Sequence, residues 1–116
     1  MKHPVIILAL LIAVFSPVSA QSIDKGHAFA KADDYTAALK EWKPLAEQGN
    51  AEAQYLLGFL FQHGLGVASY NDKEAAKWYG LAAEQGHSKS QFELAEAYHW
   101  GTGVIQNYAE AVKWHY

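Results

Sequence analysis

The sequence contains no cysteine, so it can form neither a disulfide framework nor a cysteine nucleophile. It also contains no arginine, and its nine lysines stand against twelve acidic residues, which gives a net charge of −3 over 116 residues. Proteins that bind nucleic acids or anionic membrane surfaces usually present a basic face, so both kinds of partner are disfavoured. Apolar residues make up 51% of the chain, which is enough to build a core and argues against disorder.

Long apolar runs are absent too, with one exception near the N-terminus. Residues 5–15 form an apolar run of 11, which is too short for a membrane-spanning helix of about 20 residues. Lys2 precedes the run, Pro17 follows it, and Val18-Ser19-Ala20 has the small residues that a signal peptidase requires. We therefore interpret residues 1–20 as a signal peptide that is removed after Ala20, with a buried N-terminal helix or a retained anchor as the alternative. The protein is then expected to be exported, to the periplasm or the medium, without a membrane span.

The remaining sequence repeats itself with a period in the mid-thirties. Residues 51–67 and 88–104 are identical at five of 17 positions, at an offset of 37. Residues 71–79 and 107–115 are identical at five of nine positions. A degenerate copy lies upstream at residues 34–49, six of whose 16 residues recur 37 positions later. Such a period is typical of stacked helical hairpins.

Each repeat divides into two helices separated by glycines. Asn50 is placed to cap a first helix that runs to about Gln62, and Gly64-Leu65-Gly66 ends it. Asn71 opens the second helix with Glu74 three residues later, and the next repeat has the same pair. No segment alternates apolar and polar residues as an exposed strand does. We therefore predict an all-α fold, an α/α solenoid of antiparallel helix hairpins.

The pattern resembles the Sel-one-like repeat family, which is related to the tetratricopeptide repeats. The matching residues are AEAQY-x-LG-xx-F-xx-G-x-GV from Ala51 and KEAAKWYGLAAEQG from Lys73. The resemblance implies a tetratricopeptide-like superhelix with three parts: a degenerate N-terminal hairpin at 21–49, a complete repeat at 50–86 and a C-terminally truncated repeat at 87–116. The sequence departs from the family pattern where Ala95 replaces the glycine found at Gly58, and where Glu41 stands in place of Trp78.

The same resemblance implies an interaction role, because proteins of this family typically scaffold or adapt other proteins, in bacteria often at the cell envelope. We expect the chain to bind another protein or peptide, to need no cofactor and not to be an enzyme. The alternative is a hydrolase of the β-lactamase-like kind reported for cysteine-rich relatives, from which this cysteine-free chain differs.

Histidines are the residues that most invite a metal or catalytic interpretation. Those beyond the signal peptide show neither an i, i+4 pairing nor an HExxH arrangement; they are His27, His63, His87, His99 and His115. We expect them to be solvated or to cap helices, with His87 in the place of Asn50, and we predict neither a metal site nor a catalytic site. The Gly64-Leu65-Gly66 loop follows a helix rather than a strand, which favours a helix stop over a phosphate-binding loop.

The first helices of the repeats are the best candidates for a binding surface, because such helices line the inner curve of a solenoid. In these helices, Tyr55, Leu57, Gly58 and Phe61 are assigned to the core. The other face carries the predicted partner-binding residues Leu56, Phe59, Gln62, Glu93, Glu96 and His99, extended by Trp100. A second candidate is the C-terminal edge, where an uncovered apolar face is suited to a partner or to self-association.

Overall fold

The computed structural model describes residues 20–115, and all regular secondary structure in that range is helical. Residues 20–31 form the first described helix. The helices that follow are α2 (Tyr35–Glu47), α3 (Ala51–His63), α4 (Asp72–Glu84), α5 (Ser88–Trp100) and α6 (Tyr108–His115). The all-α prediction is thus confirmed. The predicted signal peptide lies outside the described residues, apart from Ala20.

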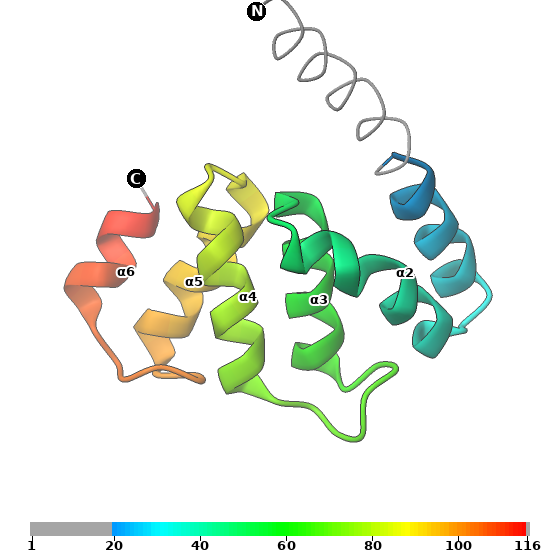
Figure 1. Cartoon of the computed structure of the whole chain (residues 1–116). Coiled ribbons are helices and arrows are strands. Elements are labelled where there is room, and N and C mark those ends of the chain that lie inside the picture. Colours follow the sequence, from blue (N-terminus) through cyan, green and yellow to red (C-terminus); the bar gives the residue numbers. More distant parts are fainter. Residues whose placement is uncertain (1–19, 116) are drawn as a thin grey trace, which may run out of the picture.

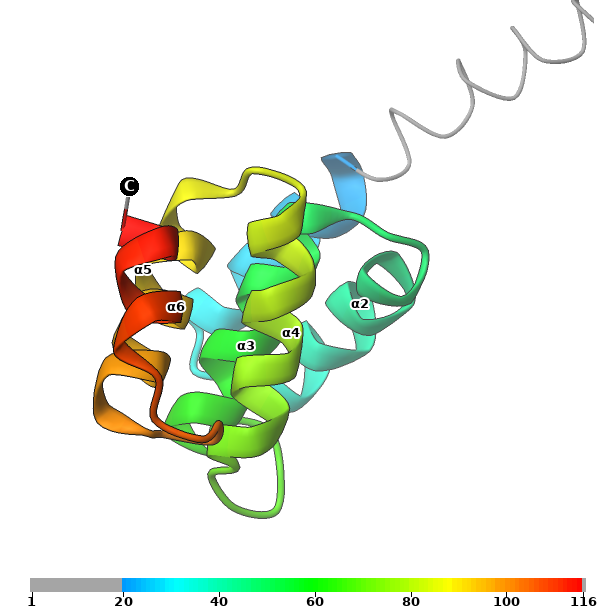
Figure 2. The same cartoon turned by 90° about the vertical axis from the view of Figure 1, so that its left-hand side faces the viewer.

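The helices form a row of hairpins that follows the order of the sequence (Figure 1). Each labelled helix packs mainly on its neighbours in the chain, α2 on α3, α3 on α4, α4 on α5 and α5 on α6. Viewed from the end of the row that carries α6, successive helices lie one behind another (Figure 2). Within residues 20–115, no helix combines the length and the hydropathy needed to cross a bilayer.

The helix starts are fixed by the predicted capping residues. The side chains of Asn50, Asn71 and Asn107 each accept a hydrogen bond from the backbone N–H three residues later, at 2.9, 3.0 and 3.1 Å. These bonds satisfy amide groups that a helix N-terminus would otherwise leave without a partner. His87 takes this place at the start of α5, where its Nδ1 accepts from the Ser90 N–H at 3.3 Å. The predicted capping role of His87 is therefore confirmed.

Glycine is required in the loops after α3 and α5 because the backbone packs closely there, and not only because a helix ends. Gly66 and Gly103 adopt the left-handed conformation, with φ values of 71° and 75°, which favours glycine. A Cβ at Gly66 would clash with the Tyr35 carbonyl oxygen, and one at Gly103 would clash with the Asp72 carbonyl oxygen. Each loop thus packs against the start of the second helix of the preceding hairpin, which agrees with the helix-stop interpretation.

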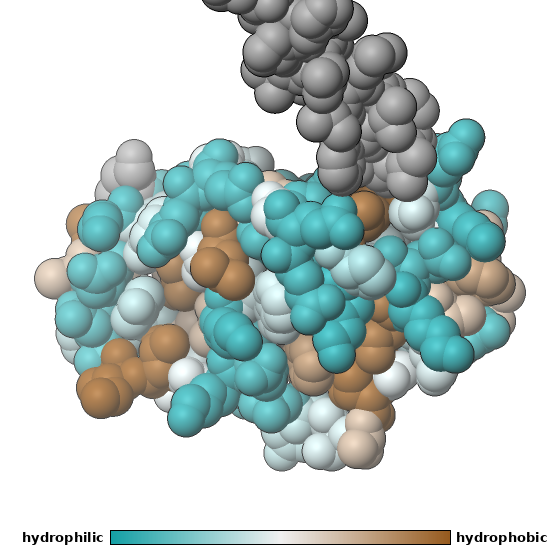
Figure 3. Space-filling model, in the orientation of Figure 1, coloured by the Kyte–Doolittle hydropathy of each residue, from teal (hydrophilic) through white to brown (hydrophobic). Residues whose placement is uncertain are grey.

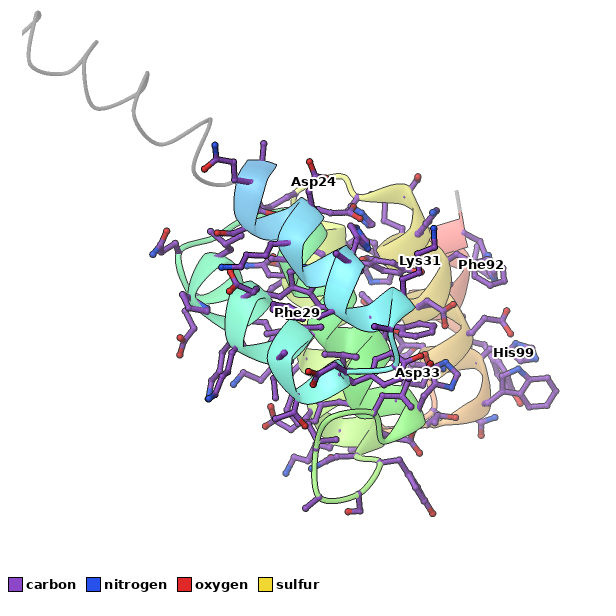
Figure 4. The ribbon with its side chains drawn as sticks, turned by 90° about the vertical axis from the view of Figure 1, so that its right-hand side faces the viewer. Asp24, Phe29, Lys31, Asp33, Phe92 and His99 are labelled. Atoms are coloured by element: carbon purple, nitrogen blue, oxygen red, sulfur yellow. The ribbon has the colours of Figure 1, made fainter. Side chains whose placement is uncertain are left out.

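A core cluster lies between the first hairpin and α3, and Trp78 of α4 also belongs to it. Its buried members include Trp42 at 2% exposure and Leu57 and Leu60 at 1% each. The Trp42 indole N–H donates to the Ile23 carbonyl oxygen at 3.2 Å, which ties the helix at residues 20–31 to α2. Phe29, between these two helices, packs against the same cluster (Figure 4). The first hairpin is therefore an integral part of the array.

The first described helix keeps the register of the later repeats, which the sequence comparison did not detect. Three residues connect this helix with α2, whereas eight residues connect α3 with α4. When the shorter connection is taken into account, Gly26 has the position in the first described helix that Gly58 has in α3. A Cβ on Gly58 would lie 2.6 Å from ring carbons of Tyr79, and one on Gly26 would overlap the ring of Trp42. The small residue at this position therefore leaves room for an aromatic ring of the second helix of its hairpin.

Candidate functional site

A cavity of about 320 Å³ opens between α3, α4 and α5. We call it the acidic hollow. The polar and aromatic residues that characterise its lining are Asp72, Tyr79, Phe92, Glu93, Glu96 and Trp100. Gln62 lines it from the C-terminal end of α3. No lysine or histidine takes part in the lining.

The hollow exists because three leucines of the first repeat have no counterpart in the second. In the first repeat these leucines pack in or against the core between the first hairpin and α3. The residues that stand 37 positions later line the hollow; the pairs are Leu56 and Glu93, Leu60 and Ala97, and Leu65 and Thr102. A leucine is thus replaced once by a carboxylate and twice by a smaller side chain. The second repeat gives up apolar packing at this place, which is unfavourable for stability by itself.

Tyr79 forms a buried wall of the hollow. Tyr79 is only 3% exposed, and its hydroxyl donates a 2.6 Å hydrogen bond to Gln62 Oε1. Burial raises the pKa of the Tyr79 hydroxyl above its ordinary value of 10.0, and the neighbouring Glu93 carboxylate raises it further. Tyr79 is therefore a neutral hydrogen-bond donor that stays committed to Gln62.

The three carboxylates of the hollow differ in their partners. The Trp100 indole N–H donates to Glu96 Oε2 at 3.2 Å, and His115 Nε2 lies 3.5 Å from Glu96 Oε1. Asp72 and Glu93, in contrast, have no side-chain hydrogen bond or salt bridge to any residue between 20 and 115. The hollow therefore presents two carboxylates whose acceptor capacity is free within the described part of the chain.

Aromatic rings stand at the rim of the hollow, open to solvent. Phe92 is 54% exposed and Trp100 is 68% exposed. Phe92 projects outward from α5, as does His99 further along the same helix (Figure 4). The arrangement as a whole offers a ligand hydrogen-bond acceptors, negative charge and aromatic faces.

Four of the seven partner-binding residues predicted from the sequence line the hollow, namely Gln62, Glu93, Glu96 and Trp100. Phe59 is exposed but packs on His63, with ring centroids 4.5 Å apart, and does not line it. His99 also lies outside the lining, because its ring packs between those of Trp100 and Tyr108 at centroid distances of 4.5 and 5.4 Å.

The prediction that Leu56 lies on this surface is wrong. Leu56 is only 8% exposed and belongs to the core cluster that contains Trp42. The prediction gave α3 one buried face, whereas the first hairpin covers a further side of this helix. Asp72, Tyr79 and Phe92 also line the hollow and were not predicted from the sequence. The contrast between leucines in one repeat and polar or small residues in the next is the signal that could have found this site.

The histidines of the described residues are engaged in structural contacts. His87 Nε2 lies 2.8 Å from Glu52 Oε2, and its ring stacks on that of Tyr55 at a centroid distance of 4.9 Å. Between residues 20 and 115, no group of three or more His, Cys, Asp or Glu side chains is arranged to hold a metal ion.

Two further cavities lie between the second helices of the hairpins and have a different character. One of about 470 Å³ lies between α4 and α6 and is lined in part by Lys73, Lys77 and Lys113. The other, of about 230 Å³, lies between α2 and α4 and is lined in part by Lys43 and Lys77. On the side of the molecule where α4 lies in front, apolar surface occurs in separate spots among hydrophilic residues (Figure 3). These lysines distinguish both cavities from the acidic hollow.

The second predicted surface, the C-terminal edge, corresponds to α6. Its Tyr108 and Val112 are 60% and 58% exposed. Self-association through this helix stays a prediction.

The sequence is similar to that of a known protein family and of a human protein. A model of the Sel1 repeat family matches residues 51–87 and 88–116, which together are more than half of the chain. The chain is 37% identical over 80 residues to the human protein sel-1 homolog 2, in an alignment that covers 69% of this chain and 12% of that protein.

Two solved structures are similar in both fold and sequence. A Sel1 repeat protein from Oxalobacter formigenes has 42% identity and a TM-score of 0.74, over 80% of this chain and 38% of that one. A protective antigen present in uropathogenic Escherichia coli strains, which displays an SLR fold, has 31% identity and a TM-score of 0.79, over 84% of this chain and 21% of that one. The chain therefore spans less than half the length of each of these proteins.

Proposed function

Because the chain belongs to the Sel1 repeat family, whose members are generally non-catalytic interaction modules, we propose that it binds another protein through the acidic hollow. The observation that carries this proposal is the exchange of core leucines for an open, polar and aromatic cavity in the second repeat. Trp100 and Phe92 are large exposed rings beside carboxylates. An aromatic anchor with a polar rim is typical of the energetic centre of a protein interface.

The alternative function, a β-lactamase-like hydrolase, gains no support from the names of the relatives or from the side chains of the hollow. A nucleic-acid partner is not proposed either, because three of the lining residues are acidic and none is basic.

Photo-crosslinking in the native cells tests the proposed binding site. A photoreactive phenylalanine analogue replaces Phe92 at the rim of the hollow, and in a matched variant it replaces Leu81, which is 40% exposed and lines the cavity between α4 and α6. We expect a discrete protein adduct from position 92, absent from position 81 and lost when Trp100→Ala is added. The same adducts from both positions, no adduct from position 92, or an adduct that survives Trp100→Ala would contradict the proposal.

We further propose that the protein acts in the cell envelope after export. The support is the basic start, the 11-residue apolar run and the Val18-Ser19-Ala20 site of the N-terminal sequence. The intact mass of the protein from an envelope fraction should correspond to a chain that begins at Gln21. A full-length mass that includes Met1 would contradict the cleavage.

A further inference from the structure

We propose that the acidic hollow receives an arginine side chain presented by the partner protein. This inference rests on the proposed function of the hollow as a protein-binding site, and it names the chemistry that the site recognises.

The charge of the lining selects a cation. Three carboxylates, from Asp72, Glu93 and Glu96, face the hollow without any basic residue in the lining. The cavities between α4 and α6 and between α2 and α4 mix carboxylates with lysines. A cationic group is therefore attracted to the acidic hollow and is not specifically attracted to the other two.

The aromatic walls select a cation that can lie against a flat ring. Trp100 and Phe92 leave most or about half of their surface exposed, at 68% and 54%. Cations bind the faces of such rings, and tryptophan binds them best. The Trp100 indole N–H donates to Glu96, which holds the indole ring and the carboxylate next to each other at 3.2 Å. A ring and a carboxylate fixed side by side are a suitable receptor for a group that is both planar and charged.

Arginine fits this receptor better than lysine. Its guanidinium group is planar, stacks on aromatic faces and carries five N–H donors that can bind carboxylates in the plane of the group. Asp72 and Glu93 line the same cavity as Trp100 and have acceptor oxygens without partners among residues 20–115, so these oxygens are available to a guanidinium group in the hollow. The cavity of about 320 Å³ lies at the lower end of the range of about 300–1,000 Å³ for pockets that hold small ligands, which suits one long side chain. The 116 residues contain no arginine, so a second copy of this sequence is not the proposed occupant.

The test is a titration of the protein, expressed from its full sequence, with N-acetyl-arginine-N-methylamide. The signal is the indole N–H resonance of Trp100 in the NMR spectrum, assigned by its absence from Trp100→Phe. Parallel titrations use the lysine and norleucine analogues, which keep a long side chain but change or remove the charged group. We expect a saturable shift with the arginine compound, a weaker one with lysine and none with norleucine.

Two variants that remove the same charge locate the site. Glu93→Gln should weaken arginine binding by about tenfold, the usual effect of losing one hydrogen bond between charged groups. Glu84→Gln, at an exposed position that lines the lysine-containing cavity between α4 and α6, should leave binding unchanged.

Each contrary result overturns the inference. These results are no shift with arginine, an equal response to lysine or norleucine, equal effects of the two variants, or a resonance that moves with protein concentration alone, which would mean that a second copy fills the hollow. The inference and the proposed function can fail separately. A protein adduct at position 92 without arginine binding would support the hollow as a protein-binding site but contradict its recognition of arginine. Arginine binding without an adduct would support the recognition of arginine but contradict the protein-binding role.

Discussion

Substitution of a helical glycine by alanine should change the stability of the fold differently at Gly58 and at Gly80. Both glycines lie inside helices, where alanine is favoured over glycine by about 1 kcal/mol. At Gly80 an added Cβ would meet nothing within 4 Å, so Gly80→Ala should stabilise the fold by about 1 kcal/mol. At Gly58 the Cβ would lie 2.6 Å from ring carbons of Tyr79.

Tyr79 has little freedom to move away from a Cβ at position 58. It is 3% exposed, and its hydroxyl is bound to Gln62 at 2.6 Å. Overpacking of this kind costs about 1–3 kcal/mol, which cancels or exceeds the gain in helix propensity. The net change for Gly58→Ala should therefore lie between zero and a destabilisation of about 2 kcal/mol.

Urea unfolding of both variants beside the wild-type protein measures the difference. We expect Gly58→Ala to be less stable than Gly80→Ala by about 1–3 kcal/mol. Equal stabilisation by the two substitutions would refute the close contact between α3 and the Tyr79 ring. A smaller m-value in either variant would mean either a more compact denatured state or unfolding that is no longer two-state, and comparison of two spectroscopic probes distinguishes the two.

Three further predictions use the same unfolding assay. Trp78→Ala should cost about 3–5 kcal/mol because it removes a large side chain that is 8% exposed, whereas Trp100→Ala, at 68% exposure, should change stability little; similar losses would contradict this account of the core. His87→Ala should cost about 1 kcal/mol through loss of the α5 cap, and His87→Asn should restore most of it, since asparagine caps α3 and α4; a failure to restore would assign the effect to the Glu52 contact instead. Burial raises the pKa of Tyr79 in the folded state, so the unfolded state loses this proton first as the pH rises. The free energy of unfolding should therefore fall as the pH rises above about 10, and it should fall less steeply in Tyr79→Phe. Parallel curves of stability against pH for the two proteins would contradict the raised pKa.

Much of the fold could be predicted from the sequence because the residues that begin and end its helices act locally. Asparagine caps and glycine stops act within three or four residues of where they stand, so Asn50 and Gly64 mark helix α3 without knowledge of the rest of the chain. The register of the first hairpin was missed for the opposite reason. Its connection is five residues shorter, so a comparison at the offset of 37 that aligns the other repeats does not bring Gly26 and Gly58 together.

The candidate site was only partly predictable, because burial depends on which neighbours cover a helix. The positions of Leu56 and Glu93 are equivalent in sequence, yet one is core and the other lines a cavity. Helical periodicity identifies the sides of α3 but does not show that the first hairpin covers one of them. Tyr79 and Asp72 belong to α4, so their part in a site on α5 becomes visible only when the two helices are packed together.

Filling the hollow tests most directly the claim that the second repeat exchanges packing for binding. The double variant Glu93→Leu, Ala97→Leu gives α5 the leucines that α3 has at the equivalent positions. Cavity filling should stabilise the fold by about 0.5–2 kcal/mol, which shows that the variant is folded. The decisive measurement is the yield of the protein adduct from the photoreactive residue at position 92 in this variant. We predict that the adduct disappears while stability rises. An undiminished adduct in the stabilised variant would contradict the claim that the acidic hollow is the binding site.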